Sequence, residues 1–553
     1  DATVNNRRLD IIRGMESTGF MARLAVNSFI CDIPWENVVK EADILSKITK
    51  EDIVKFANEN LADNYVYVKK LQARRDDDGS KIDKPAITPI FTNRDTSSLF
   101  LRTIREEAAA VAPIEPVFVD FSRDMDRLTA KSGIEVLYKQ NVTNELFEVD
   151  YIFETGRYAD LILPFACDYI NYLGTSTMTP EDVQKYLYSL ACNMTVSCTG
   201  ERTYVTIDGL AENMEEVMKF MEEFIADAQP NREALAMLKA NTIQERLNAK
   251  TDQGSNAGRL RSYATYGPEN PNRHILSAAQ LKALTDEELL DRIHKIFNAE
   301  HSILYYGPMA GSDFVTLVND VHRCPETLSK VAGGNPFMEK VTAENTVLIA
   351  PFDANQSIIY SISSKDEKFN ADKEAIINLY NEYFGGGMNS IVFQEMREAR
   401  GLAYSAAARY NQPSDKEHNA VYMDFIQTQN DKIVDALAAF DEIINNMPRS
   451  QKAFDIAKEG LLANLRTQRT VKASVIWQYL NTRKLGLDYN LTEKVYNALQ
   501  DMTLEDVVKF QQENVKDRKY TICILGRESD FDMDGLAKYG KIRKLTTEEI
   551  FGY

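Results

Sequence analysis

Gly385-Gly386-Gly387-Met388-Asn389-Ser390, followed by Phe393-Gln394-Glu395-Met396-Arg397-Glu398-Ala399-Arg400-Gly401-Leu402-Ala403-Tyr404-Ser405, is the most informative stretch of the chain. An apolar helix ending in Tyr383-Phe384 precedes the glycines, and a second helix follows them. Three consecutive glycines free the backbone for a close approach to a neighbouring group. Arg397 and Tyr404 then place polar donors beside the glycines. The arrangement predicts a helix, a glycine break, a second helix and a strand, and it suits the gripping of a peptide.

Three other segments of the chain repeat one pattern. Each has a Thr that predicts a helix N-cap, acidic residues in the following turn and then a short amphipathic helix. A strand rich in β-branched and aromatic residues follows each helix. The cap residues are Thr49, Thr285 and Thr503, and the predicted strands are 65–68, 303–306 and 520–525.

The repeats are spaced by roughly 220 residues, the length of a whole domain, whereas solenoid repeats have roughly 20 to 50 residues. We therefore expect duplicated domains, although three unrelated helix caps remain an alternative because capping signals are common. Strands and helices are segregated along each copy. This predicts an α+β fold of repeated two-layer sandwiches, each an antiparallel-rich sheet with helices packed on one face.

The copies also predict domain boundaries. Thr49 lies so close to the start of the sequence that the first copy is expected to lack most of its body. Polar and proline-punctuated sequence marks a connector after it. We expect residues 1–72 to be the C-terminal part of a truncated first copy, 73–126 a linker with one helix, 127–326 a middle copy, 327–342 a junction and 343–553 a last copy.

Composition narrows the classes of partner. A net charge of -19 and a pI of about 5.0 disfavour nucleic acid and anionic membrane surfaces and favour basic peptides. No apolar run reaches the roughly 18 residues of a membrane span, so no membrane insertion is expected. No signal peptide is visible at Asp1, and any such segment is expected upstream. The six cysteines lie apart in apolar segments, which favours buried thiols over a disulfide framework.

The glycine break and the Arg-x6-Tyr spacing of Arg397 and Tyr404 resemble the peptide-holding segment in the last domain of the pitrilysin/insulinase family of zinc metallopeptidases. The resemblance covers essentially the whole chain. It implies sandwich domains of the LuxS/MPP-like metalloprotease type, namely part of the second and all of the third and fourth of four domains. It also implies that Arg397 and Tyr404 hold a peptide carbonyl and stabilise its oxyanion, with Gly385, Gly386 and Gly387 beside them.

The inverted zinc motif of that family, His-x-x-Glu-His, is not in this sequence. In the family it lies a few residues before a Gly-Thr pair, which here is Gly174-Thr175, so its positions are taken by Phe165, Asp168 and Tyr169. Phe cannot bind zinc and Tyr is a poor substitute for imidazole. The corresponding stretch of the last copy, 376–384, has no histidine, and the five scattered histidines of the chain receive no role. We expect both copies to be non-catalytic, with no metal and no cofactor bound.

The resemblance implies a function for the whole chain. It would be the substrate-binding, chamber-forming C-terminal portion of a zinc metalloendopeptidase that degrades peptides or unfolded segments. Zinc is expected in a missing N-terminal half or on a partner subunit, and this chain alone is expected to hydrolyse nothing. The family favours a periplasmic location. Two alternatives stay open: an inactive scaffold subunit of the same fold, as in the core proteins of respiratory complexes, and a purely structural role for Arg397 and Tyr404 as a surface charge and a strand residue.

Overall fold

The computed structural model describes residues 2–61, 63–71 and 98–553. These residues divide into two compact units, one within Met15–Glu115 and one formed by Ala2–Gly14 and Pro116–Tyr553. The smaller unit contains α2 (Thr18–Ile30), α3 (Trp35–Val39), α4 (Glu41–Leu45), α5 (Lys50–Asn60) and α6 (Leu99–Ala109). Residues 73–97 of the predicted linker lie outside the described residues, and α6 is the helix expected in that linker.

The first repeat segment is predicted correctly in its helix and wrongly in its strand. The hydroxyl of Thr49 accepts the N–H of Asp52 at the start of α5, and the Asp52 carboxylate accepts the N–H of Thr49. The predicted strand at 65–68 does not form, and Val66 there is 90% exposed. A strand needs a neighbour for its backbone groups, and none of the strands in the described residues pairs with this segment.

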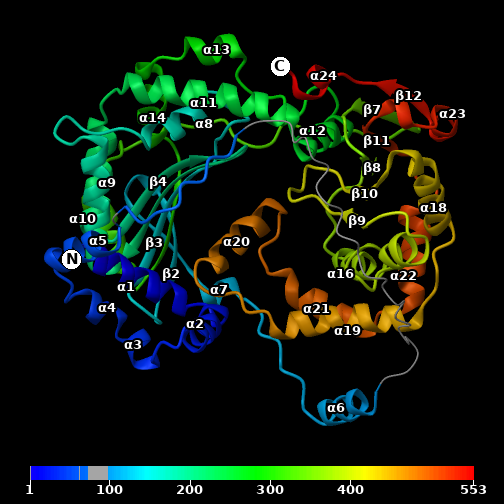
Figure 1. Ribbon diagram of the computed structural model, residues 1–553, viewed down its shortest axis with the longest axis horizontal. Helices are drawn as coiled ribbons and strands as arrows, with labels where there is room; N and C mark the ends of the chain where they lie inside the picture. The colour runs from blue at the N-terminus through cyan, green and yellow to red at the C-terminus, as the bar shows by residue number, and fades with distance from the viewer. Residues whose placement is uncertain (1, 62, 72–97) are drawn as a thin grey trace. The chain divides into compact units, whose positions relative to one another are not determined.

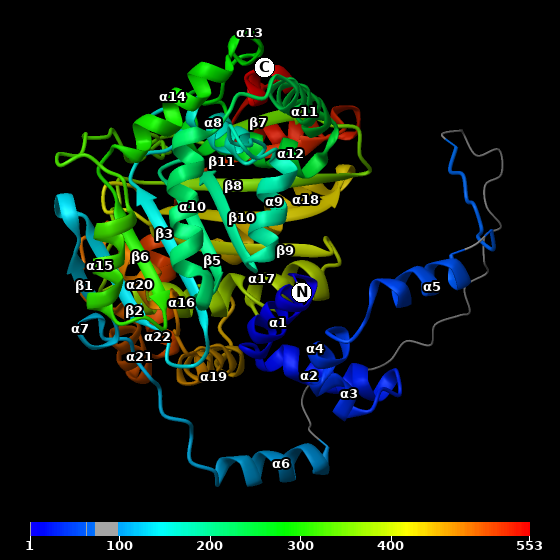
Figure 2. The same cartoon turned by 90° about the vertical axis from the view of Figure 1, so that its left-hand side faces the viewer.

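The larger unit contains two six-stranded sheets, of which the first lies in the middle copy. Its order is β1-β2-β6-β3-β5-β4, and every neighbouring pair is antiparallel except β2 and β6. Helices α8 to α11, α14 and α15 supply the apolar side chains that cover one face (Figure 2). The strands are β1 (Asp126–Thr129), β2 (Glu135–Gln140), β3 (Leu146–Phe153), β4 (Cys192–Cys198), β5 (Thr203–Leu210) and β6 (Ser302–Gly307); the helices are α8 (Leu163–Ile170), α9 (Pro180–Ser189), α10 (Met214–Asp227), α11 (Arg232–Thr251), α14 (Asp286–Phe297) and α15 (Gly311–Val321).

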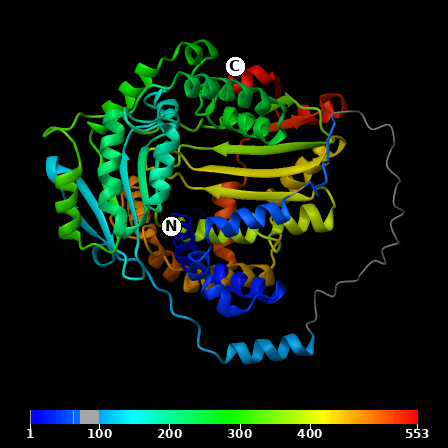
Figure 3. The ribbon, with the colours of Figure 1, turned by 60° about the vertical axis from the view of Figure 1, so that its left-hand side comes forward.

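The second sheet lies in the last copy and has the order β12-β7-β11-β8-β10-β9 (Figure 3). Its parallel pairs are β12 with β7 and β7 with β11. One face is again covered by helices, which follow β8 and the hairpin of β9 and β10 along the chain. The strands are β7 (Thr346–Pro351), β8 (Gln356–Ser364), β9 (Ser405–Asn411), β10 (Val421–Gln429), β11 (Thr521–Gly526) and β12 (Lys541–Lys544); the helices are α16 (Glu374–Tyr380), α18 (Ile433–Asn445), α19 (Gln451–Thr467), α21 (Leu491–Asp501) and α22 (Leu504–Phe510).

The predicted fold is therefore confirmed: each sheet is mixed and antiparallel-rich, with helices packed on one face. The duplication also appears in individual contacts. In the middle copy, Lys239 of α11 donates from Nζ to the carbonyl of Leu284 at 2.6 Å. In the last copy, Lys458 of α19 donates in the same way to the carbonyl of Met502 at 2.9 Å. In both copies the carbonyl belongs to the residue just before the Thr cap of the repeat. A lysine at the equivalent position of the long helix therefore holds the same loop in each copy.

The opposite face of each sheet is covered by a helix of the other copy, which the sequence did not predict. Helix α12 (Gln253–Tyr266) of the middle copy packs Leu260 and Tyr263 against the second sheet and α24 (Thr547–Phe551). Helix α20 (Ser474–Lys484) of the last copy packs Ile476 and neighbouring residues against the first sheet (Figure 1). Both helices follow the long helix of their own copy. This reciprocal exchange buries the second face of both sheets over inner strands, which are β2, β3 and β6 in the first sheet and β7, β8 and β11 in the second. It explains why 116–553 lies within a single unit.

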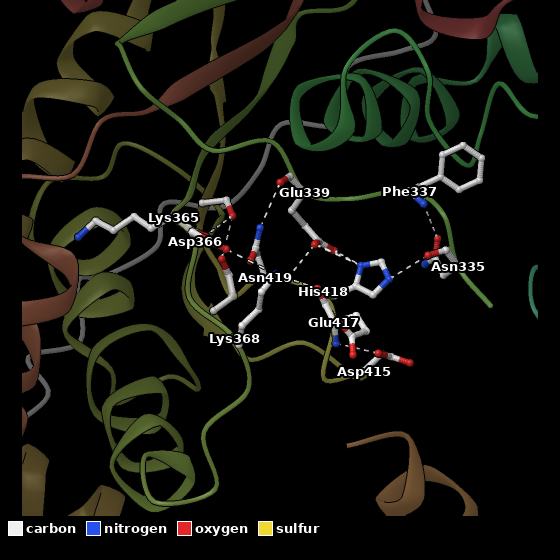
Figure 4. Close-up of polar contacts among 12 residues, drawn as sticks. Asn335, Phe337, Glu339, Lys365, Asp366, Lys368, Asp415, Glu417, His418 and Asn419 are labelled. Carbon is white, nitrogen blue, oxygen red and sulfur yellow. Dashed lines mark hydrogen bonds and ion pairs between the residues drawn. The ribbon is translucent and has the colours of Figure 1, made fainter. Parts of the chain in front are cut away.

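The junction between the copies is held by a buried polar cluster (Figure 4). The carboxylate of Glu339 accepts hydrogen bonds from Nδ1 of His418 at 3.2 Å and from the backbone N–H of Asn419 at 2.9 Å. His418 lies in the hairpin loop between β9 and β10. The hydrogen bond to Glu339 raises the pKa of His418 above its ordinary value. Nearby, the backbone N–H of Lys340 donates to the carbonyl of Thr265 in α12 at 2.7 Å.

None of the helices described combines the length and the apolar composition that a membrane span requires.

Candidate functional site

The glycine break begins where a helix turns onto the edge of the second sheet. Helix α16 continues into a π-helical turn, Asn381–Gly385, and such turns are frequent at functional sites. Gly385 is buried against β9, where a Cβ atom would lie 1.8 Å from the carbonyl oxygen of Ala408. Only glycine fits this approach. The first glycine therefore sets the distance between the helix and the edge strand.

The other two glycines form an exposed corner. Gly387 has φ of +37°, in the left-handed region that favours glycine. The hydroxyl of Ser390 donates to the carbonyl of Gly387 at 2.9 Å and accepts the N–H of Phe393, which caps the next helix. Met388 at the tip is 71% exposed. The corner thus leaves backbone and a flexible apolar side chain open to a ligand.

The second helix holds Arg397 on its outer side. It consists of α17 (Ile391–Phe393) and a second π-helical turn, Gln394–Ala399. Val392 and Met396 are fully buried in the core of the last copy and fix the orientation of the helix. The chain then turns at Gly401, which has φ of +61°, and enters β9. Tyr404 is the residue immediately before that strand.

The structure brings Arg397 and Tyr404 together. The guanidinium carbon of Arg397 lies 4.6 Å from the ring centroid of Tyr404 and 4.9 Å from that of Phe393. Nε of Arg397 is 3.6 Å from the carboxylate of Glu398, a weak contact at the surface. Tyr404 is 78% exposed. This distance is typical of a cation–π contact between the guanidinium of Arg397 and the ring of Tyr404.

The pair lies on open surface. A pocket of about 210 Å³ in the last copy is lined by residues such as Glu374, Arg409 and Tyr410 at the far end of β9. It does not include Arg397 or Tyr404. The candidate site is therefore an exposed rim along the start of the edge strand.

The edge strand itself is partly protected beside the site. The side-chain amide of Asn381 donates to the carbonyl of Tyr410 at 2.9 Å and accepts its N–H at 2.8 Å. An amide used in this way imitates a neighbouring strand and blunts the edge. Within β9, Ala406 and Ala408 lie on the same side as Tyr410, between this protected end and Tyr404. That short length is the part of the edge next to the predicted site.

The residues at the zinc-motif positions do not fit a zinc ion. Phe165 is buried among apolar side chains in α8, and the side chain of Asp168 is exposed. Tyr169 is buried; its hydroxyl accepts the backbone N–H of Asn231 at 2.7 Å and donates to the carboxylate of Asp286. Burial raises the pKa of the Tyr169 phenol above its ordinary value, so it stays neutral. The hydroxyl of Tyr169 thus donates one hydrogen bond and accepts another within the fold.

The last copy repeats the arrangement with Tyr383. Its hydroxyl donates to the carbonyl of Pro448 at 2.7 Å and accepts the N–H of Ser450 at 3.0 Å. Ser450 and Asn231 are the N-cap residues of the long helices α19 and α11. In both copies, therefore, a tyrosine anchors the start of the long helix. Sequence reasoning assigned no such role to these tyrosines, because the helix caps that they contact are distant in the sequence.

Two histidines of the middle copy contact an acidic side chain and a backbone carbonyl. Nδ1 of His322 and Oε1 of Glu222 are 2.6 Å apart, with both side chains buried. Nδ1 of His301 contacts the carbonyl of Ala299, and burial lowers the pKa of His301 to about 4. Across 2–61, 63–71 and 98–553, no three His, Cys, Asp or Glu residues are grouped so that they could hold a metal ion. The sequence carried no signal for the pair of His322 and Glu222.

Residues 283–461 match the family model described as the peptidase M16 inactive domain. That part of the chain is similar to a non-catalytic domain of the peptidase M16 family. This confirms the resemblance on which the sequence interpretation rests. A curated relative from Rickettsia felis, named an uncharacterized zinc protease, is 26% identical over 278 residues. That alignment covers 48% of this chain and 63% of the relative, so the chain spans less than two thirds of that protein.

Solved structures share the fold. The M16 inactive domain from Pseudomonas fluorescens superposes with a TM-score of 0.57 at 18% identity, covering 73% of this chain and 98% of that one. A mutant of the ferredoxin protease FusC, solved in complex with Arabidopsis ferredoxin, gives a TM-score of 0.60 at 12% identity and covers 92% of this chain and 58% of that one. At these identities the superpositions show that the M16 fold is shared.

Proposed function

We propose that this chain is the substrate-binding, chamber-forming C-terminal portion of a zinc metalloendopeptidase that acts on peptides or unfolded segments. The observation that carries the proposal is the contact of Arg397 with the exposed ring of Tyr404, beside a glycine corner whose first residue is packed against the edge strand. The zinc protease among the relatives supports the reaction class. The domain boundaries given above and an upstream zinc-bearing half, or a partner subunit in its place, belong to the same proposal.

The chemistry follows from the two side chains. A guanidinium offers several fixed N–H donors, and a neutral phenol offers one O–H donor. The contact of Arg397 with the ring of Tyr404 holds both groups in one orientation before a ligand arrives, which is the condition for oxyanion stabilisation. An extended peptide lying beside the start of β9 would bring a carbonyl oxygen to this pair. The zinc ion that would activate the attacking water would be held by another domain.

The class of substrate rests on two further facts. The FusC protease was solved with a protein, ferredoxin, bound to it. A net charge of -19 on this chain favours basic segments over acidic ones. We therefore propose a polypeptide substrate with a preference for net positive charge.

The test measures binding of a fluorescent, unstructured basic peptide to the chain. Removal of the charge in Arg397→Gln should weaken binding by about 10-fold, since a hydrogen bond to a charged group contributes about 1.5 to 3 kcal/mol. Removal of the phenol hydroxyl in Tyr404→Phe should weaken binding by about 5-fold, since a hydrogen bond between neutral groups contributes about 1 kcal/mol. Arg400→Gln is the matched control, because Arg400 is already paired with Glu442 at 2.9 Å. In the full-length parent, Tyr404→Phe should lower peptide turnover by about tenfold or more.

Unchanged affinity in both variants would reject the peptide-binding role. It would favour the alternative of an inactive scaffold, for which an exposed arginine and tyrosine have no ligand.

A further inference from the structure

Two cysteines of the middle copy lie in one apolar cluster, one on a helix and the other on the edge strand beside it. Cys167 is in α8 and is fully buried, whereas Cys198 is the last residue of β4 and is partly exposed. Sγ of Cys198 donates to the carbonyl of Thr199 at 3.3 Å. We propose that Cys167 and Cys198 form a redox site, a dithiol that a low-molecular-weight disulfide converts into an intramolecular disulfide joining α8 to β4.

The surrounding backbone supports this closeness. The side-chain amide of Asn171 donates to the carbonyl of Cys167 at 2.7 Å and to the carbonyl of Val196 at 2.9 Å. Its oxygen accepts the N–H of Val196 at 3.1 Å. One amide group therefore bridges the helix at Cys167 and the strand at Val196, two residues before Cys198. A helix and strand held this closely allow the short separation that a disulfide needs.

The last copy shows that the Cys167 position is directed at the edge strand. Cys167 precedes Tyr169 by two residues, as Asn381 precedes Tyr383, and the two tyrosines anchor equivalent helices. The side chain of Asn381 reaches the backbone of Tyr410 in β9, at 2.8 and 2.9 Å. In the middle copy the same position carries a thiol, and the edge strand offers a second thiol.

The environment of Cys198 fits the attacking partner. Arg157 lies opposite, with its backbone N–H donating to the carbonyl of Thr199 at 2.9 Å. The hydrogen bond from Cys167, with the field of Arg157 among the smaller contributions, lowers the pKa of the Cys198 thiol. A partly exposed cysteine whose thiol pKa is lowered is the kind that reacts with disulfides. Cys167 is the resolving partner, because the hydrogen bond to Cys198 and burial keep it protonated until Cys198 has reacted.

The reaction balances with a low-molecular-weight disulfide as the oxidant. The Cys198 thiolate attacks one sulfur of that disulfide, which forms a mixed disulfide and releases one thiolate. Cys167 then loses its proton and attacks the Cys198 sulfur, which forms the intramolecular bond and releases the second thiolate. Two protein thiols are oxidised and one disulfide is reduced to two thiols. The disulfide would close a loop of about 30 residues between Cys167 and Cys198, so it should raise Tm by on the order of 5 °C.

The experiment treats the folded, fully reduced chain with oxidised glutathione and digests it without reduction for mass spectrometry. The expected product is one crosslinked peptide pair containing Cys167 and Cys198, with loss of two titratable thiols and the rise in Tm. The decisive variant is Cys167→Ala, which should stop the reaction at a stable glutathione adduct on Cys198. Cys198→Ser should abolish both products.

Cys192→Ser is the matched control, because Cys192 lies on the same strand but burial raises the pKa of its thiol to about 12. This variant should form the crosslink as the wild type does. The proposal is overturned if wild-type Cys198 stays free or keeps the glutathione adduct, or if Cys192 enters the crosslink instead. None of these readouts depends on peptide binding, so the outcome is separate from that of the proposed function.

Discussion

Replacement of Gly385 by Ala tests the close approach on which the candidate site is built. The added Cβ would lie 1.8 Å from the carbonyl oxygen and 2.5 Å from the carbonyl carbon of Ala408. Real Cβ atoms do not come so close to backbone, so either the π-helical turn or β9 must move. Overpacking of this kind costs about 1 to 3 kcal/mol, and contact with backbone on both sides of the approach places the expected value near 3 kcal/mol. For a cooperative unit of the size of 116–553, whose entropy of unfolding is about 0.9 kcal/mol/K, Tm should fall by about 3 °C.

Differential scanning calorimetry measures this change, and Gly460→Ala is the matched control. Gly460 lies in the exposed middle of α19, with no heavy atom within 4 Å of the position of an added Cβ. Alanine there should stabilise the chain by up to about 1 kcal/mol, because it restricts the unfolded chain and favours helix. Gly385→Ala should also weaken peptide binding, since Tyr404 begins the displaced strand. Equal Tm values for Gly385→Ala and the wild type would show that the close approach does not exist.

Two further predictions concern pH. Because the pKa of His418 is raised, its pair with Glu339 stabilises the fold fully below about pH 6.5, and this stabilisation is lost as pH rises through the folded pKa of His418. Because the pKa of Glu339 is lowered, the contribution of the Glu339 carboxylate is present above about pH 4.5. His418→Gln should therefore cost most stability near pH 5.5 and least near pH 8.5 in urea unfolding, and a pH-independent cost would contradict the ion pair. Burial raises the pKa of Asp424 to about 7, so the folded chain should lose stability between about pH 4 and pH 7, where this carboxyl ionises in the unfolded chain but stays protonated in the folded one. Asp424→Asn should remove that decline from the unfolding free energy, and a decline of unchanged size would show that another group causes it.

Local signals carried much of the fold. The Thr caps, the apolar strands and the polar hairpin loops depend on residues close in sequence, and the structure places them within one or two residues of the prediction. The strand at 65–68 failed because a strand depends on a neighbour and not on its own composition alone. The edge strands β1 and β12 were missed for the same reason, since each is only four residues long and is defined by pairing with a distant strand.

The sequence by itself determined the duplication, the sandwich class and the glycine break, because each is written in residue type and spacing. The tertiary structure decided which side chains meet: the contact of Arg397 with the ring of Tyr404, the anchoring of α11 by Tyr169, and the place of Cys167 and Cys198 in one apolar cluster. It also decided the exchange of α12 and α20 between the sheets. These contacts join residues far apart in the chain, and the pattern of either segment alone does not specify its partner.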